Sequence, residues 1–305
     1  MNLSHQGISV VIPAKNRAKH LPACLKSILN QTHLPDEIIV VDDHSTDETK
    51  AVVESFQNKG VKYIKNLRSP GAQGARNQGI VSATYQWIAF QDSDDLWLPS
   101  KLELQFDQLK ENNFKTDLVI HTAGFKVVPE KNEKTLITQE IVEGNCFEKL
   151  LIKQGPLFPT ILVHKSSLEV MGLLDEQCVS FQEWDTAIRL SQKNRFIFLR
   201  QPLFEWVCHS GETISKNLKR DVQGHFYILN KNKGNIWNIH GSKIWFSLMT
   251  DLICKTQSFG LIDEFKGFYL ELPAVTRFLA KRLLKGSKPI RGTHRILQLS
   301  NKLFG

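Results

Sequence analysis

The fold is decided by residues 8–43, which read ISVVIPAKNRAKHLPACLKSILNQTHLPDEIIVVDD. An apolar, β-branched run opens this stretch at 8–13, and a second one closes it at 37–43. Over 19–31 the apolar residues recur at the spacing of one helix face, which predicts a helix between the two runs. Strand, helix and strand in this order predict two parallel strands joined by a crossover helix.

The same alternation continues along the chain and weakens in its last third. Further strands are predicted at 61–65, 85–90, 116–121, 156–164, 196–199 and 203–209. Further helices are predicted at 47–57, 74–84, 99–112, 145–153, 166–172 and 180–193. Residues 126–145 are polar and predict a hairpin or a loop, and a helical pattern broken by glycines begins at Ser215. This order predicts an α/β fold.

The composition is that of a globular protein, with 305 residues of which 41% are apolar and 23% charged. The longest apolar runs span about six residues, far fewer than the roughly 20 needed to cross a bilayer, and no signal-peptide pattern opens the chain. Five scattered cysteines without a CxxC pair argue against a disulfide framework or a zinc site. We therefore expect a soluble, cytoplasmic protein with reduced thiols.

The net charge of +8 is concentrated at the carboxyl end. Residues 276–305 contain eight basic and no acidic residues, and the 31 basic residues before them equal the 31 acidic ones. Such a tail is either a solvated helix face or a peripheral contact with anionic lipid at the inner face of the cytoplasmic membrane. Aromatic residues are sparse there, so no nucleic-acid partner is expected.

An acidic run, FQDSDD at 90–95, follows the strand predicted at 85–90. Ligands of parallel sheets bind beyond the carboxyl ends of the strands, which is where this run lies. Asp92 and Asp94 are two residues apart, so their carboxylates can project to the same side, as suits Mg²⁺ or Mn²⁺ shared with a diphosphate. The alternative is a solvated acidic turn that caps the helix after Pro99.

Polar residues also follow the first two strands, PAKNR at 13–17 and DDHS at 42–45. Neither segment contains the GxGxxG of a dinucleotide fold, which argues against a hydride-transfer enzyme. Asp43 or Ser45 could serve as the N-cap of the helix predicted at 47–57, because STDE resembles a capping box. One cap does not need two carboxylates, so Asp42 and Asp43 together favour a ligand site.

Three segments in order, 8–49, GAQGARNQGI at 71–80 and WIAFQDSDDLWLPSKLELQ at 87–105, carry a family resemblance. The chain resembles glycosyltransferase family 2 enzymes of the GT-A fold over about residues 7–110. A looser match runs through LLDE, QEWD and SGETIS to 215. The resemblance implies a Rossmann-like mixed, mainly parallel sheet flanked by helices, with a helical C-terminal region. It also implies a glycosyltransferase domain over 1–215, with a nucleotide-sugar-binding half at 7–120 and an acceptor half at 121–215, followed by a helical basic region at 216–305.

The resemblance also implies roles for individual residues on the donor side. Pro13 and Ala14 fall where the end of the first strand lines the base pocket, and Asp43 falls where an Asp hydrogen-bonds the base. Arg76 matches an Arg near the base and phosphates, and a cation behind two glycines at a helix start suits an anion. These positions predict binding of a nucleotide-sugar donor.

Metal-site roles follow from the same resemblance. Asp92 matches the member of the D-x-D motif nearer the ribose, and Asp94 matches its metal ligand, which is Mg²⁺ or Mn²⁺ in the family. Asp95 is expected to be supportive, for example by capping the next helix. His209 falls where the family often has a His near the diphosphate and the metal.

A general base is implied before the helix of the acceptor half. The family has an acidic pair there, whose second member removes the acceptor hydroxyl proton, and this chain has Gln182 and Glu183 instead. Glu183 is one methylene longer than the usual Asp, and Asp185 is the alternative base. The resemblance therefore implies an inverting transferase that uses Glu183.

The expected function is transfer of a sugar from a UDP- or dTDP-sugar to a saccharide or lipid-linked saccharide acceptor, in bacterial cell-surface polysaccharide assembly. One alternative is a nucleotidyltransferase of related fold, although PAKNR lacks the glycines of its phosphate loop. The other is a non-catalytic nucleotide-sugar-binding protein, which the substitution of Gln182 for the acidic residue leaves open.

Overall fold

The structure is a computed structural model of the chain, and it describes residues 6–137, 141–208 and 217–261. By its internal contacts the chain divides into two compact units. The first comprises Met1–Gln177 and Gln182–Gly211, and the second comprises Cys178–Phe181 and Glu212–Gly305. The first unit contains the sheet and the candidate site.

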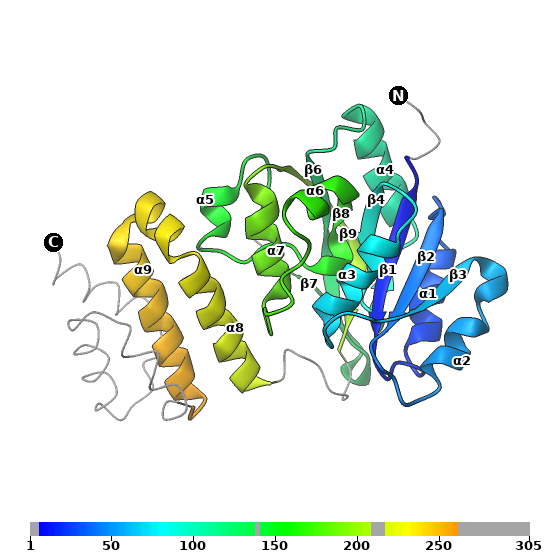
Figure 1. Cartoon of the computed structure of the whole chain (residues 1–305), viewed down its shortest axis with the longest axis horizontal. Coiled ribbons are helices and arrows are strands. Elements are labelled where there is room, and N and C mark those ends of the chain that lie inside the picture. Colours follow the sequence, from blue (N-terminus) through cyan, green and yellow to red (C-terminus); the bar gives the residue numbers. More distant parts are fainter. Residues whose placement is uncertain (1–5, 138–140, 209–216, 262–305) are drawn as a thin grey trace. The chain divides into compact units, whose positions relative to one another are not determined.

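A mixed sheet of nine strands, counted over the described residues, forms the centre of the first unit. The strands are β1 Ile8–Ala14, β2 Glu37–Asp42, β3 Val61–Lys65, β4 Trp87–Phe90, β5 Leu96–Trp97, β6 Leu118–Val128, β7 Glu133–Leu136, β8 Leu162–His164 and β9 Arg195–Val207. Their order is β3-β2-β1-β4-β8-β6-β9-β5, with β7 paired to β6. The strands β3, β2, β1 and β4 are all parallel and lie side by side in Figure 1. The expected α/β fold with a mixed sheet is confirmed.

Helices cover both faces of the parallel part of this sheet. The helices of the first unit are α1 Leu21–Leu29, α2 Thr49–Glu54, α3 Ala72–Ser82, α4 Lys101–Glu111, α5 Phe147–Leu150, α6 Lys165–Val170 and α7 Gln182–Ser191. Short 3₁₀ helices occupy Gln57–Lys59, Pro129–Lys131 and Phe158–Thr160. Helix α3 packs on the face that carries Val11 and Val41, because a Cβ added at Gly79 would lie 2.4 Å and 3.2 Å from their side chains. Successive strand residues alternate between faces, so Val10 and Val40 point to the opposite side.

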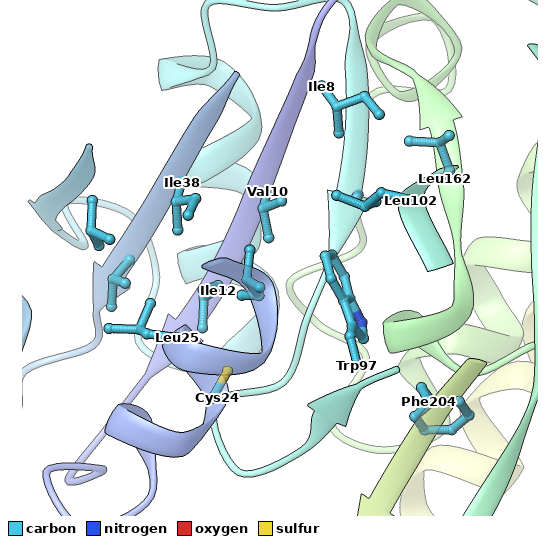
Figure 2. Packing of buried hydrophobic residues seen from close by; sticks show 14 of the residues in the cluster. Ile8, Val10, Ile12, Cys24, Leu25, Ile38, Trp97, Leu102, Leu162 and Phe204 are labelled. Atoms are coloured by element: carbon cyan, nitrogen blue, oxygen red, sulfur yellow. The ribbon is translucent and has the colours of Figure 1, made fainter. Parts of the chain in front are cut away.

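The main core lies on that opposite face. Figure 2 shows Val10 and Ile12 of β1 pointing toward Cys24 and Leu25 of α1. All four are buried, and residues from α2, α4 and β8 join the same cluster. Burial of apolar surface stabilises a fold by roughly 25 cal/mol per Å², so this layer contributes to the stability of the unit. This apolar layer fixes the positions of the parallel strands, and the polar residues that follow the strands lie at the carboxyl edge of the sheet.

Two expected strands, at 196–199 and 203–209, are instead one long strand, β9, paired in parallel with β6. The register shifts between Thr122 and Ala123 and again between Ala123 and Phe125. These irregularities accommodate extra residues of β9 without ending the pairing, so residues 200–202, which separate the two expected strands, belong to β9. The polar stretch at 126–145 contains the hairpin of β6 and β7, as expected.

The extended segment expected at 156–164 is mostly not a strand. Phe158–Thr160 form a 3₁₀ turn, and β8 occupies only the last three residues, Leu162–His164. Pro159 at the start of that turn has no N–H to donate to a sheet, which accounts for the difference.

The second unit consists of two helices in its described part, α8 Leu218–Lys231 and α9 Lys233–Ser258. Helix α9 is broken at Gly241, whose φ of 82° is a left-handed conformation that suits glycine. Asp221 of α8 pairs with Lys255 of α9. Within 6–137, 141–208 and 217–261, no helix is long and apolar enough to traverse a bilayer.

Candidate functional site

The carboxyl ends of β1 and β2 bring three of the predicted donor residues together. Pro13 and Ala14 pair in register with Val41 and Asp42, and the Asp43 N–H donates to the Ala14 carbonyl at 2.7 Å. Pro13, Ala14 and Asp43 are all buried. The parallel register therefore sets Asp43 directly beside the end of the first strand.

The Asp43 carboxylate is held on both oxygens. Asn66 Nδ2 donates to Oδ1 at 2.7 Å, and the Gly71 N–H donates to Oδ2 at 2.9 Å. Oδ1 also lies 3.5 Å from His44 Nδ1. A carboxylate oxygen has two lone pairs, so Oδ2 retains capacity for a ligand donor. Asp43 is thus a buried acceptor with a defined orientation, as recognition of an N–H on a base requires.

Asp42 has a structural role instead. Its Oδ2 accepts from the Tyr63 hydroxyl at 2.6 Å, and its Oδ1 accepts from the Ser45 N–H at 3.0 Å. Burial raises the pKa of Tyr63, and the bond to the Asp42 carboxylate raises it further. Asp42 therefore fixes the loop that carries Asp43.

The expected N-cap role of Asp43 or Ser45 is wrong. Helix α2 begins at Thr49 after Glu48, and Ser45 Oγ accepts from the Asn16 N–H at 2.9 Å. Asp47 Oδ1 accepts from the Thr49 N–H at 3.0 Å. The sequence pattern resembled a capping box, but Ser45 is used to connect the loops after β1 and β2.

Two arginines lie among the carboxylates of the acidic run. Arg76 Nη2 donates to Asp92 Oδ1 at 2.7 Å, and Arg17 Nη2 lies 3.4 Å from Asp94 Oδ2. Arg17 follows β1, whereas Arg76 lies on α3 behind the glycines of GAQGARNQG. These two cations offset the repulsion between the carboxylates, which answers how three acidic residues are tolerated in one turn.

Asp95 is buried, unlike Asp92 and Asp94. Its Oδ1 accepts from the Val207 N–H of β9 at 2.9 Å. Burial raises the pKa of Asp95 well above its usual value, and the neighbouring Asp92 and Asp94 charges raise it further. The expected capping of the next helix is wrong, because Ser100 is the N-cap of α4 and Asp95 joins the acidic run to β9.

Arg76 is the centre of the site. Its guanidinium is buried, stacks on the Phe158 ring at 4.0 Å, and donates to Gln73 Oε1 at 3.1 Å. The same Nη1 donates to Gln182 Oε1 at 3.2 Å, and Nη2 donates to Asp92. One side chain of α3 therefore connects the acidic run with the first residue of α7.

Glu183 and Asp185 lie in the first turn of α7 and differ in environment. Burial raises the pKa of Glu183, the Arg76 charge opposes that rise, and the Asp92 charge adds to it. Asp185 has no exposed surface and lies 3.6 Å from Arg189 Nη1, one turn along the same helix. Glu183 is partly exposed, so it is the better placed of the two to meet a substrate hydroxyl.

The carboxylates present fit a shared divalent ion. No group of three or more His, Cys, Asp or Glu among the described residues could hold a metal on its own. Mg²⁺ usually takes one or two protein carboxylates and completes its shell with phosphate oxygens and water. The side chains of Asp92 and Asp94 are 32% and 17% exposed, so both can meet such a ligand.

Sequence reasoning missed two contacts of this site. Arg17 was expected only as part of a polar strand end, and Gln182 only as a departure from the family pair. Because the carboxyl ends of parallel strands meet at one edge of the sheet, the position of Arg17 after β1 could have predicted its proximity to the acidic run. No local sequence pattern indicates that Gln182 accepts a hydrogen bond from Arg76. His209 lies outside the described residues.

Comparison with known proteins identifies the family. Residues 9–164, about half of the chain, match the family described as "Glycosyl transferase family 2". An uncharacterized glycosyltransferase of Rickettsia bellii is 34% identical over 228 residues, which are 73% of this chain and 32% of that protein. An Escherichia coli protein, "UDP-Glc:alpha-D-GlcNAc-diphosphoundecaprenol beta-1,3-glucosyltransferase WfgD", is 38% identical over 106 residues, which are 35% of this chain and 42% of that protein. The chain thus spans less than half the length of these relatives.

Solved structures support the fold. Residues 1–349 of S. aureus TarS, solved in complex with UDP-GlcNAc, superpose with a TM-score of 0.62 at 20% identity. The match covers 90% of this chain and 79% of that one. The fold expected from the resemblance is therefore confirmed.

Proposed function

The chain belongs to glycosyl transferase family 2, and we propose that it transfers a sugar from a UDP- or dTDP-sugar to a hydroxyl acceptor with inversion. The observation that carries this proposal is the position of Arg76. It hydrogen-bonds Asp92 of the acidic run and Gln182 at the start of α7, residues that are 90 positions apart in the sequence. Arg76 thus links the acidic run, where we propose that the donor binds, to the first turn of α7, which also carries the proposed base Glu183.

Donor binding is assigned to the edge formed by β1, β2 and the acidic run. Pro13 and Ala14 line the base pocket, and the Asp43 carboxylate accepts from the base. Asp92 lies toward the ribose, while Arg76 offers a guanidinium to the diphosphate, since planar forks of N–H donors suit phosphate oxygens. His209 is proposed near the diphosphate by resemblance.

Asp92 and Asp94 would hold Mg²⁺ or Mn²⁺ together with the diphosphate. When bound, such an ion neutralises charge on the phosphate oxygens and orients the leaving group. Arg17 lies beside Asp94, so this chain also supplies a cation of its own next to the motif. The developing negative charge on the leaving group is then stabilised by groups already in position, which is the usual main contribution to such catalysis.

Glu183 acts as the general base. The acceptor hydroxyl oxygen attacks the anomeric carbon from the face opposite the diphosphate, the bond from that carbon to the phosphate oxygen breaks, and the hydroxyl proton passes to the Glu183 carboxylate. An unperturbed Glu has a pKa of about 4.3, far below that of an alcohol, so the proton moves late, when bonding to carbon has acidified the hydroxyl. The raised pKa of Glu183 makes it a stronger base than a solvated Glu.

A lipid-linked saccharide is the proposed acceptor, in bacterial cell-surface polysaccharide assembly. The E. coli relative is named for a diphosphoundecaprenol-linked acceptor, which supports this choice. We also propose a cytoplasmic protein that contacts the inner face of the membrane through the basic residues of 276–305, which lie outside the described residues. Flotation with anionic and neutral liposomes tests that contact, and binding that is indifferent to lipid charge or to removal of 276–305 rules it out.

The domain division follows from these roles. We propose a glycosyltransferase domain over 1–215, with a donor half at 7–120 and an acceptor half at 121–215, and a helical basic region at 216–305.

The proposed activity is tested with a panel of nucleotide sugars. Thermal unfolding of the purified chain is measured with each compound in MnCl₂, in MgCl₂ and in EDTA, followed by transfer assays with the sugars that stabilise it. Stabilisation by UDP- or dTDP-sugars, and transfer that requires the metal, are expected. Stabilisation by nucleoside triphosphates alone points to a nucleotidyltransferase, and donor binding without transfer points to a binding protein; either result overturns the proposal.

A further inference from the structure

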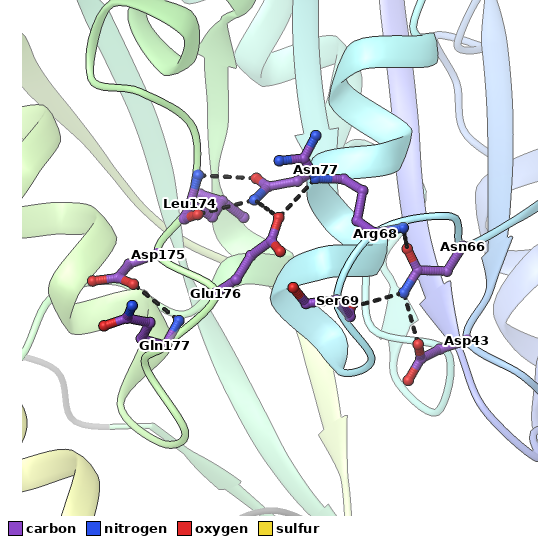
Figure 3. A network of polar contacts seen from close by, with 9 residues as sticks. All are labelled: Asp43, Asn66, Arg68, Ser69, Asn77, Leu174, Asp175, Glu176 and Gln177. Carbon is purple, nitrogen blue, oxygen red and sulfur yellow. Dashed lines mark hydrogen bonds and ion pairs between the residues drawn. The ribbon is translucent and has the colours of Figure 1, made fainter.

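One motif of the sequence has no part in the site as described so far, the segment LLDE at 173–176. Its last residue, Glu176, accepts from Arg68 Nε at 2.7 Å and from Asn77 Nδ2 at 2.8 Å, as Figure 3 shows. Arg68 lies in the loop before α3, whereas Asn77 lies on α3 itself. Glu176 therefore ties the segment before α7 to two places on the donor side.

Asn77 holds this segment with the geometry of a peptide group. Its Nδ2 donates to the Leu174 carbonyl at 2.9 Å, and its Oδ1 accepts from the Leu174 N–H at 2.9 Å. Asn77 is buried and directly follows Arg76 on α3. The two neighbours thus hold different parts of the acceptor half, Arg76 through Gln182 and Asn77 through Leu174.

The loop 66–71 continues from Arg68 to the Asp43 carboxylate. The Arg68 N–H donates to Asn66 Oδ1 at 3.0 Å, and Asn66 Nδ2 donates both to Asp43 Oδ1 at 2.7 Å and to the Ser69 carbonyl at 3.1 Å. The N–H of Gly71 donates to the other oxygen of Asp43. Figure 3 shows this series of contacts from Glu176 to Asp43.

The loop packs closely against α3. A Cβ added at Gly74 would lie 1.9 Å from the Ser69 carbonyl oxygen, so the loop backbone passes directly against the helix. The side chain of Arg68 is 39% exposed, and its bond to Glu176 is the contact that draws the outer part of the loop toward the acceptor half. Without that contact the Arg68 side chain is free to move into solvent, and the loop that orients Asp43 is less restrained.

We propose that Glu176 is a positioning residue for the nucleotide base: it holds loop 66–71 through Arg68, so that Asn66 and Gly71 fix the Asp43 carboxylate for donor binding. This inference rests on the proposed function, because it takes Asp43 as the acceptor for the base. The Glu176 carboxylate remains charged at neutral pH, since its hydrogen bonds from Asn77, Ser69 and Arg68 outweigh the effect of burial and lower its pKa to about 2. The donor affinity is thereby coupled to a residue of the acceptor half.

The test measures UDP binding by isothermal titration and steady-state kinetics for Glu176→Gln and Arg68→Gln. Each variant is expected to raise the Kd for UDP and the KM for the donor by ~5- to 20-fold, the lower range of typical coupling between sites, with kcat changed less than about twofold. The Kd of the double variant for UDP is expected to be no higher than that of either single variant, because both substitutions interrupt the same contact. Glu176→Asp is expected to restore part of the affinity.

Asp107→Asn is the matched control. It removes the carboxylate of an ion pair with Lys110 on the exposed side of α4, and it is expected to leave UDP affinity unchanged. Thermal unfolding identifies any variant that has lost its fold, in which case Arg68→Gln, at a partly exposed side chain, carries the test.

The outcomes separate this inference from the proposed function. A wild-type chain that binds no UDP overturns both. Wild-type binding with unchanged Kd in Glu176→Gln and Arg68→Gln overturns the positioning role alone. So does a fall in kcat at constant Kd, or an equal loss of affinity in Asp107→Asn.

Discussion

Replacing Glu183 by Gln tests the general base and has opposite expected effects on activity and stability. The side chain keeps its size and loses the ability to take a proton. General-base catalysis contributes about 10²- to 10⁴-fold to the rate, so kcat is expected to fall by that factor. This fall corresponds to an activation free energy that is higher by about 3–5 kcal/mol. The KM for the donor is expected to stay within about twofold, because Glu183 makes none of the donor contacts proposed above.

Stability is expected to rise in the same variant. Burial raises the pKa of Glu183, so its ionised form is less favourable in the folded chain than in the unfolded one. At neutral pH a neutral amide avoids this cost, and it also removes repulsion with Asp92. We therefore expect Glu183→Gln to raise the free energy of unfolding at neutral pH.

Asp185→Asn is the paired variant, and it is expected to lower stability while leaving the rate of transfer nearly unchanged. The Asp185 side chain is fully buried beside Arg189, whose own side chain is 20% exposed. Breaking a buried pair costs about 3–5 kcal/mol, and because Asn retains an oxygen we expect about 2–3 kcal/mol, or a fall in Tm of roughly 4–12 °C. Transfer by the folded variant is expected to continue at a near wild-type rate.

The measurements are steady-state transfer over a range of donor concentrations, which gives kcat and the KM for the donor, and thermal unfolding, on all three proteins at one pH. Retention of more than half of kcat by Glu183→Gln would refute the assignment of the base. A loss of activity in Asp185→Asn with unchanged Tm would transfer the role to Asp185.

Three further results are expected. The acidic limb of the kcat/KM profile should have its midpoint above the pH of about 4.3 of an ordinary Glu, because the base must be unprotonated and its pKa is raised; a midpoint below that value contradicts the assignment. Gly79→Ala should lower stability by about 1–3 kcal/mol, because the new methyl would lie 2.4 Å from Val11; an unchanged denaturant midpoint would show that α3 moves freely on the sheet. The pKa of Glu176 is about 2, so its contribution is complete above the unfolded value of roughly 4.3 and is lost as pH falls toward 2. Urea unfolding at pH 5 and pH 3 should therefore show about 1–2 kcal/mol more loss for the wild type than for Glu176→Gln, after allowance for partial exposure; equal losses would contradict this contribution.

The sequence predicted the elements of the parallel part well. Strands β1 to β4 and helices α1 to α4 occur close to their expected residues, because apolar periodicity reports directly on which side of an element is buried. Prediction from the sequence was less accurate where a strand is irregular, as in β9. It was also less accurate where a polar side chain has several possible partners, as at Ser45. Local hydrogen-bonding patterns look alike whether the side chain caps a helix or bonds a neighbouring loop.

The sequence by itself determined that an acidic run follows a central strand and that polar residues gather at one edge of the sheet. Both follow from the order of strands and helices along the chain and from the residues at which each strand ends, and local sequence encodes these features. Only the tertiary structure decided how those charges are compensated. Arg76 meets Asp92 and Gln182, and Asp95 meets Val207, across separations of 16, 106 and 112 residues. Such partners depend on which loops the packed core brings within hydrogen-bond distance, and no short segment of sequence contains that information.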